Sequence, residues 1–245
     1  MSAGMDIVIT MAGLGSRFKK AGYKVPKYMI EAHGKTLFEW SMISLSGYQE
    51  HAGQYIFIVQ KGDRAADFIA SECRKLGIEK HQLVEIDYLT DGQATTAMLA
   101  ARVWNKENEL LIYNIDTYIE AGQMSYEQLS GDGFIPCFCG EGDHWSFVKL
   151  DENRKAVEVR EKERISPYCT VGAYYFGSAK MYEELYREYY ADQGNLEKGE
   201  KYVAPLYNYM IGKGMGVYIS EIAREAVHVL GTPEELDLFL KDYKA

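Results

Sequence analysis

The sequence has neither an excess of positive charge nor a long apolar run. Its 245 residues carry a formal net charge of −9 at pH 7, and this acidity argues against nucleic-acid binding as the main task. No apolar run approaches the roughly 18 residues that a membrane span needs. Residues 1–5 lack the charged and apolar regions of a signal peptide. We therefore expect a cytoplasmic protein with no nucleic-acid or membrane partner.

Cysteine is scarce, and its spacing argues against a zinc site. The sequence contains four cysteines, which are Cys73, Cys137, Cys139 and Cys169. A structural zinc site needs two close-set pairs, and only Cys137 and Cys139 form one. We therefore expect reduced and partly buried thiols.

Two common nucleotide-binding patterns are missing from the glycine-containing loop near the start of the chain. A dinucleotide-binding loop follows the pattern G-x-G-x-x-G, but Phe18 takes the place of its third glycine. The ending G-K-[ST] of a Walker A loop is absent as well. The loop therefore predicts a different kind of phosphate site.

The loop does contain glycines and cations in an informative order. An apolar stretch enters it, Gly13 and Gly15 follow, and Arg17 and Lys27 come next. Glycines let backbone N–H groups approach phosphates without a Cβ in the way, and the two cations can neutralise phosphate charge from two sides. This order favours a nucleoside triphosphate site. The residues expected to form it are Met11, Ala12, Gly13, Gly15, Ser16 and Arg17.

With Pro26 placed before Lys27, the loop resembles the N-terminal motif of the sugar-phosphate nucleotidyltransferases, the nucleotide-sugar pyrophosphorylases. That motif is roughly an apolar strand, then A-G-x-G-x-R, then P-K. Met11 departs from it, since many members have alanine there. Further motifs recur in the same order, so the resemblance covers nearly the whole chain. It implies an Mg²⁺-dependent enzyme that binds a nucleoside triphosphate (NTP) and a phosphomonoester and releases pyrophosphate.

Strand-like and helix-like stretches alternate over residues 1–130. Such alternation implies a mostly parallel sheet with helices on both faces. We therefore expect a Rossmann-like, mixed α/β fold with ligands beyond the carboxyl ends of its strands. Asp63 is expected to cap a helix. The expected strands are 6–11, 55–60, 83–89 and 110–115, and the expected helices are 36–48, 63–76 and 94–103.

Short strands with turns between them follow Gly131. We expect this strand-rich insertion to fold over the sheet and to bind the acceptor. The chain is then a single domain with a nucleotide-binding part (1–130), an acceptor-binding part (131–230) and a C-terminal helix (231–245). Thr232 would cap that helix, with Pro233 in its first position. Within the acceptor-binding part the expected strands are 134–139, 145–150, 156–160, 170–176 and 215–220, and the expected helices are 178–191 and 202–212.

Asp116 is the residue expected to bind metal. It follows the buried strand 110–115, and Mg²⁺ prefers one or two carboxylates plus phosphate oxygens. An aspartate at this position can also be a helix cap or a turn residue. The resemblance favours the metal, because the matching strand of the family ends in a metal-binding aspartate.

The family's second metal aspartate is missing. It normally lies two residues before G-T-P, but here Val229 stands two residues before Gly231-Thr232-Pro233, with His228 beside it. Either His228 or water replaces that ligand, or Asp116 and the triphosphate hold the ion without it. By its position alone, His228 is more typical of an ordinary strand histidine than of a ligand.

Two more stretches resemble family motifs. Gly92-Gln93-Ala94 is similar to a turn over the nucleobase, where Thr90 and Gln93 could hydrogen-bond base edges. Glu161-Lys162 is similar to an E-K pair whose glutamate holds sugar hydroxyls and whose lysine binds the phosphomonoester, although Glu163 replaces the usual proline. Without the resemblance this pair is typical of a surface charge run. Gly172 matches a glycine that lets a sugar lie against backbone.

Nucleotidyl transfer requires cations and a metal carboxylate rather than a strong base, because the attacking phosphomonoester is already an anion. Arg17, Lys27 and Lys162 are the expected catalytic cations. The function we expect is transfer of a nucleoside monophosphate from an NTP to a sugar 1-phosphate. A cytidylyltransferase acting on a non-sugar phosphomonoester, a glycosyltransferase and a non-catalytic nucleotide-binding protein are the alternatives. The many tyrosines and methionines are compatible with a homodimer.

Overall fold

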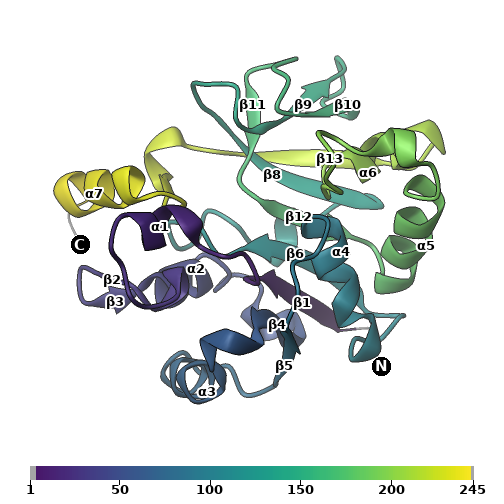
Figure 1. Cartoon of the computed structure of the whole chain (residues 1–245). Coiled ribbons are helices and arrows are strands. Elements are labelled where there is room, and N and C mark those ends of the chain that lie inside the picture. Colours follow the sequence, from purple (N-terminus) through teal and green to yellow (C-terminus); the bar gives the residue numbers. More distant parts are fainter. Residues whose placement is uncertain (1–3, 244–245) are drawn as a thin grey trace.

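The computed structural model describes residues 4–243, and a large mixed sheet runs through it (Figure 1). The strands of this sheet are β1 (Met5–Thr10), β4 (Ala52–Gln60), β5 (His81–Ile86), β6 (Glu109–Asn114), β8 (Gly133–Cys139), β9 (Ser146–Leu150), β10 (Ala156–Glu161), β11 (Tyr168–Thr170), β12 (Ala173–Phe176) and β13 (Val217–Ile222). They lie in the order β10-β9-β11-β8-β12-β6-β1-β4-β5, and β13 pairs with β8. Strands β6, β1, β4 and β5 are parallel, whereas β12 is antiparallel to both β6 and β8.

Helices cover both faces of the sheet, as expected. The helices are α1 (Ser16–Lys20), α2 (Leu37–Ile43), α3 (Ala66–Lys75), α4 (Gln93–Met98), α5 (Ala179–Tyr189), α6 (Pro205–Gly212) and α7 (Pro233–Asp242). Successive side chains of a strand point to opposite faces. In β1, Ile7 and Ile9 accordingly join a core with residues of α2 and α3, while Val8 joins a second core with residues of α4, α5 and α6. The sequence therefore predicted the α/β class correctly.

The strand-rich insertion extends the sheet, and the expectation that it folds over the sheet was wrong. Strand β12 pairs with the free edge of β6, and β8 pairs with β12. An unpaired strand edge exposes backbone donors and acceptors, and β12 satisfies those of β6. Strands β9, β10 and β11 lie beyond β8, at the end of the sheet farthest from β5 (Figure 1).

Several element boundaries differ from those predicted. The expected strand 170–176 is interrupted, because Gly172 adopts a φ of +80° between β11 and β12. The expected helix 94–103 is α4 followed by the 3₁₀ turn Leu99–Arg102. Asp63 does not cap α3, whose N-cap is Ala65. The Asp63 carboxylate instead accepts a hydrogen bond of 2.9 Å from the Tyr28 hydroxyl.

The C-terminal segment packs against β7 and α1. Strand β14 (Val227–Val229) pairs with β7 (Thr117–Ile119), which directly follows the end of β6. The Thr232 hydroxyl caps α7 by accepting a 3.1 Å hydrogen bond from the Glu235 N–H, and Pro233 begins the helix as predicted. Phe18 of α1 and Leu236 of α7 share a small core. Helices α1 and α7 therefore lie side by side (Figure 1).

Residues 4–243 include all four cysteines and all of the helices described above. Within that range the four cysteines are free, and three of them are buried. Over the same range, no helix combines the length and the apolar character needed to cross a membrane.

Candidate active site

A cavity of about 1150 Å³ lies beyond the carboxyl ends of the parallel strands. It is lined by residues that follow β1, β5 and β6, and also by residues of the insertion. Ligands of open α/β sheets bind in such a crevice. The predicted site residues that line it are Met11, Ala12, Gly13, Gly15, Arg17, Lys27, Thr90, Gly92, Gln93, Asp116, Glu161, Lys162 and Gly172, whereas Ser16 and His228 do not line it.

The glycine loop, residues 11–15, presents backbone to the cavity. Met11 and Ala12 are buried, with 3% and 5% of their surface exposed. Gly15 adopts a left-handed φ of +60° as the N-cap of α1, a conformation that favours glycine. A Cβ at Gly13 would meet no atom within 4 Å, so this part of the loop is open. Arg17 follows on α1 and lines the cavity.

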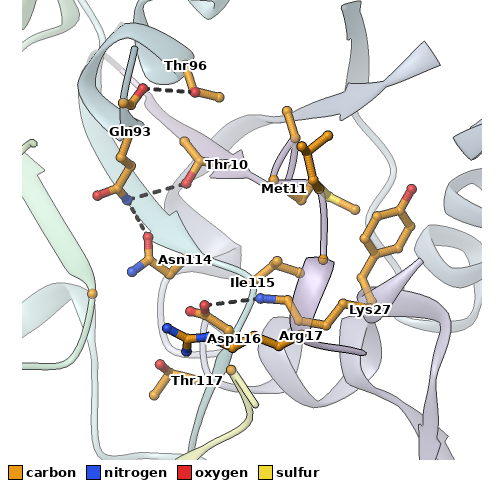
Figure 2. A pocket seen from close by; sticks show the side chains of 18 of the residues that line it. Thr10, Met11, Arg17, Lys27, Gln93, Thr96, Asn114, Ile115, Asp116 and Thr117 are labelled. Carbon is orange, nitrogen blue, oxygen red and sulfur yellow. Dashed lines mark hydrogen bonds and ion pairs between the residues drawn. The ribbon is translucent and has the colours of Figure 1, made fainter. Parts of the chain in front are cut away.

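Lys27 and Asp116 meet at the centre of this site. The Lys27 Nζ lies 3.1 Å from the Asp116 Oδ2, and their side chains are 18% and 38% exposed. Arg17 lines the same cavity (Figure 2). Two of the predicted cations and the predicted metal carboxylate therefore lie together in one cavity.

The donors around Asp116 fit a hard divalent cation. A Cβ added to Gly231 would lie 3.5 Å from the Asp116 Oδ2 and 3.3 Å from the Glu235 Oε2, so these two carboxylates flank the same glycine. Carboxylate oxygens are the ligands that Mg²⁺ prefers, with phosphate oxygens completing its shell. Within residues 4–243, no group of three or more His, Cys, Asp or Glu side chains is arranged to hold a metal ion. Asp116 and Glu235 could supply two oxygen ligands, and phosphate oxygens of a bound ligand would have to supply others.

His228 does not line the cavity that Asp116 lines. In β14, His228 is opposite Tyr118 and Val229 is opposite Thr117, so alternation along the strand turns Val229 to the cavity and His228 away from it. The His228 Nε2 is 3.3 Å from the Glu120 Oε1, and its ring stacks on Tyr118. Burial lowers the pKa of His228, although Glu120 opposes this shift. The interpretation of His228 as an ordinary strand histidine agrees with this position.

The Gln93 amide is anchored at the ends of two strands. Its Nε2 donates to the Thr10 hydroxyl at 3.3 Å and to the Asn114 Oδ1 (Figure 2). The Thr90 hydroxyl lies 2.6 Å from that of Thr96. Sequence reasoning expected Thr90 and Gln93 to face a base but missed Thr10 and Asn114. Thr10 and Asn114 are the last residues of β1 and β6. Their position at the carboxyl ends of parallel strands is the signal that could have identified them.

The predicted acceptor pair lies at the end of β10. The Glu161 side chain is 7% exposed, and it accepts a hydrogen bond from the Ser146 hydroxyl. Burial raises the pKa of the Glu161 carboxyl, although Ser146 and Lys162 oppose this shift. The Lys162 Nζ is 3.5 Å from the Glu161 Oε1 and donates to the Tyr202 hydroxyl at 2.6 Å. No sequence motif indicated Tyr202 or Trp145, which line the same cavity.

Gly172 joins the two halves of the cavity. A Cβ at this position would lie 2.5 Å from the Asn114 Nδ2, and the residue has a φ of +80°. Only glycine fits such a close approach in a left-handed conformation. Asn114 in turn accepts from Gln93. Contacts therefore run from Gln93 through Asn114 to Gly172. They link residues 90–94, the turn predicted to lie over the nucleobase (the base turn), to the insertion.

Three solved structures resemble the chain over nearly its whole length. The chain is 39% identical to the nucleoside-diphosphate-sugar pyrophosphorylase of Vibrio cholerae RC9, with a TM-score of 0.89, over 96% of this chain and 100% of that one. The inositol-1-phosphate CTP transferase of T. maritima has a TM-score of 0.75 at 15% identity, over 100% and 99% of the two chains. The CTP:phosphocholine cytidylyltransferase of Streptococcus pneumoniae has a TM-score of 0.75 at 17% identity, over 98% and 100%. No protein-family model and no curated protein matches the sequence.

Proposed function

Since the chain belongs to the sugar-phosphate nucleotidyltransferases, we propose that it transfers a nucleoside monophosphate from an NTP to a sugar 1-phosphate, releasing pyrophosphate and forming a nucleotide sugar. The observation that carries this proposal is the arrangement of charge in one cavity. Arg17, Lys27 and Asp116 line the cavity from the glycine loop and the segments after Pro26 and β6, whereas Glu161 and Lys162 line it from the insertion. Such a site can hold two phosphorylated ligands against each other.

The reaction is a displacement at the α-phosphorus of the NTP. An oxygen of the phosphomonoester forms a bond to that phosphorus, and the bond from phosphorus to the bridging oxygen of pyrophosphate breaks. Pyrophosphate leaves with the electron pair, and no proton has to be removed from the nucleophile. Arg17 and Lys27 neutralise charge on the leaving side, and Lys162 binds the incoming phosphate. Asp116, with Glu235 beside it, would hold Mg²⁺, which neutralises triphosphate charge when bound.

The second candidate is a cytidylyltransferase whose acceptor is not a sugar. Two of the structural neighbours act, by their descriptions, on inositol 1-phosphate and on phosphocholine. The acceptor side of the cavity combines aromatic rings of Trp145 and Tyr202 with carboxylates of Glu161 and Glu200. Aromatic faces and carboxylates bind cationic alcohols as well as sugars, so this candidate is tested alongside the first.

The test is pyrophosphate release with Mg²⁺, crossing CTP, UTP, GTP, ATP and dTTP with sugar 1-phosphates, inositol 1-phosphate and phosphocholine. Release with one sugar 1-phosphate supports the proposal and identifies both substrates. Release only with a non-sugar acceptor replaces it with the second candidate. Silence across the panel, with a nucleotide sugar consumed instead, points to a glycosyltransferase. Silence with nucleotide binding alone points to a non-catalytic protein.

The cellular location and the oligomeric state of the protein are the last two points of the proposal. We propose a cytoplasmic enzyme, in agreement with the expectation from the sequence. A homodimer stays a prediction, which sedimentation of the purified chain would test.

A further inference from the structure

A short segment between α5 and α6 connects the two sides of the cavity. We call residues 200–202 the bridge segment. The Lys201 N–H donates to the Asp91 carbonyl at 2.7 Å, and the Lys201 carbonyl accepts from the Ala94 N–H at 3.0 Å. The Lys201 Nζ also lies 2.8 Å from the Asp91 Oδ2. Lys201 is therefore fixed to the predicted base turn by its backbone and by its side chain.

The contact between Lys201 and this turn is close enough to require glycine. A Cβ at Gly92 would lie 2.6 Å from the Lys201 nitrogen and closer still to its carbonyl oxygen. Gly92 also has a φ of +142°, which other residues rarely adopt. A larger residue at this position would push Lys201 away from the turn.

The next residue, Tyr202, contacts the predicted acceptor lysine in two ways. Its hydroxyl accepts a 2.6 Å hydrogen bond from the Lys162 Nζ, and its ring centroid lies 4.4 Å from the same nitrogen. Its carbonyl accepts a 2.6 Å hydrogen bond from the Tyr190 hydroxyl, which fixes the backbone on the opposite side. Tyr202 is thus both anchored and in contact with Lys162.

Lys162 has an unusual backbone conformation, and two contacts hold its side chain. Its φ is +55°, a left-handed conformation that costs free energy in a non-glycine residue and persists only when the surroundings hold it. Around its ammonium group are the Glu161 carboxylate at 3.5 Å and the Tyr202 hydroxyl at 2.6 Å. These two contacts fix the direction in which the ammonium group points.

We propose that Tyr202 is the residue that positions Lys162 for the acceptor phosphate, and that the Lys201–Asp91 contact holds Tyr202 in place. Lys201 and Tyr202 are adjacent, so their Cα atoms are about 3.8 Å apart, and a shift of one displaces the other. The base turn therefore sets the position of the acceptor cation through two neighbouring residues. This inference rests on the proposed function, in which Lys162 binds the phosphomonoester.

The test is steady-state kinetics of Tyr202→Phe, which removes the hydroxyl and keeps the ring. We expect the KM for the phosphomonoester to rise about fivefold to tenfold, less than the loss of a hydrogen bond to a charged group usually costs, because the Lys162 ammonium group itself remains. The KM for the NTP and kcat should change less than about twofold. Tyr209→Phe is the matched control, because its hydroxyl bonds the exposed Glu188 outside the cavity. An unchanged acceptor KM in Tyr202→Phe overturns the proposal.

A pH profile separates positioning from a general structural defect. The Lys162 ammonium is partly buried, which alone lowers its pKa, but the Tyr202 hydroxyl, Glu161 and the more distant Glu200 outweigh burial and raise the pKa. Removing the hydroxyl should therefore move the alkaline limb of kcat/KM for the acceptor to lower pH. A Tyr202→Phe variant whose acceptor KM rises without this movement contradicts the positioning role.

Two further variants test the bridge and separate it from the proposed function. Lys201→Met should also raise the acceptor KM, and the double variant with Tyr202→Phe should raise it no further than Tyr202→Phe alone, since both act through one contact. If Lys162→Ala raises the acceptor KM while Lys201→Met does not, the bridge is wrong and the proposed function stands. If Lys162→Ala itself has no effect, the role of Lys162 in the proposed function fails, and the inference fails with it.

Discussion

The Lys27 ammonium forms a 3.1 Å ion pair with the Asp116 carboxylate, although the two residues lie 89 positions apart. Lys27 comes from the turn after Pro26, and Asp116 comes from the turn after β6. In this pair, the lysine predicted to neutralise phosphate charge contacts the aspartate predicted to bind metal. A bound triphosphate would compete for Lys27 and leave the Asp116 carboxylate free for a cation.

Lys27→Ala should lower kcat by about a hundredfold, because the lysine is proposed to neutralise charge that develops on the leaving pyrophosphate. The measurement is steady-state pyrophosphate release at saturating NTP. Lys20→Ala is the matched control, since Lys20 is exposed and does not line the cavity. A loss below about threefold in Lys27→Ala would remove the residue from the proposed mechanism.

Asp116→Asn should lower kcat by at least about a hundredfold, because an amide is a weak ligand for Mg²⁺. Chelation of metal should abolish activity in the wild type, and added Mg²⁺ should restore it. Titration with Mn²⁺ in the presence of nucleotide, followed by its paramagnetic signal, measures metal binding independently of turnover. Glu120→Gln is the control, since Glu120 pairs with His228 outside the cavity. Equal Mn²⁺ affinity in wild type and Asp116→Asn would contradict the assignment.

Lys162→Ala should chiefly raise the KM for the phosphomonoester, by about tenfold or more, because it removes a cation from the acceptor side. The NTP is expected to bind with unchanged affinity, which isothermal titration would measure. Lys149→Ala is a suitable control, since Lys149 is an exposed residue of β9 outside the cavity. A change confined to the KM for the NTP would contradict the assignment of Lys162 to the phosphomonoester.

The Glu161 carboxyl should produce an acid limb in kcat/KM for the acceptor. Because burial raises its pKa, Glu161 takes up a proton at higher pH than an ordinary glutamate, whose pKa is about 4.3. Protonation removes an acceptor for the hydroxyls of the ligand, so activity is lost as pH falls. The phosphomonoester itself titrates near pH 6, and that effect is common to all variants. The test is the difference between wild type and Glu161→Gln; identical acid limbs would contradict this prediction.

Gly172→Ala should destabilise the fold by about 1–3 kcal/mol, the usual cost of a non-glycine residue in an unfavourable backbone conformation. The new Cβ would also meet the Asn114 amide at 2.5 Å and disturb its bond with Gln93. Urea denaturation measures the free energy of unfolding. Gly212→Ala is the control, because a Cβ there meets no atom within 4 Å and φ is not positive. Equal unfolding free energies in the two variants would show that the Gly172 conformation is not required.

Much of the site followed from local sequence because phosphate loops are short and contiguous. The two glycines, Arg17 and Lys27 lie within one stretch, and Asp116 comes directly after a buried strand. Parallel strands place their carboxyl ends at one edge of a sheet, so the order of the chain was enough to expect these residues together. The α/β class followed from the same alternation. The path of the insertion did not, because pairing between β12 and β6 depends on which sheet edge is free.

The fold class, the glycine loop and half of the charged residues that line the cavity could thus be predicted from the sequence alone. These residues are Arg17, Lys27, Asp116, Glu161 and Lys162. Their contact partners could not be predicted in this way. Lys162 and Tyr202 are 40 positions apart, and no periodicity or motif relates them. The same holds for Glu235, which reaches the vicinity of the Asp116 carboxylate because β14 pairs with β7 and brings the start of α7 beside Asp116. Contacts of this kind depend on the packing of distant segments, which local propensity and spacing do not specify.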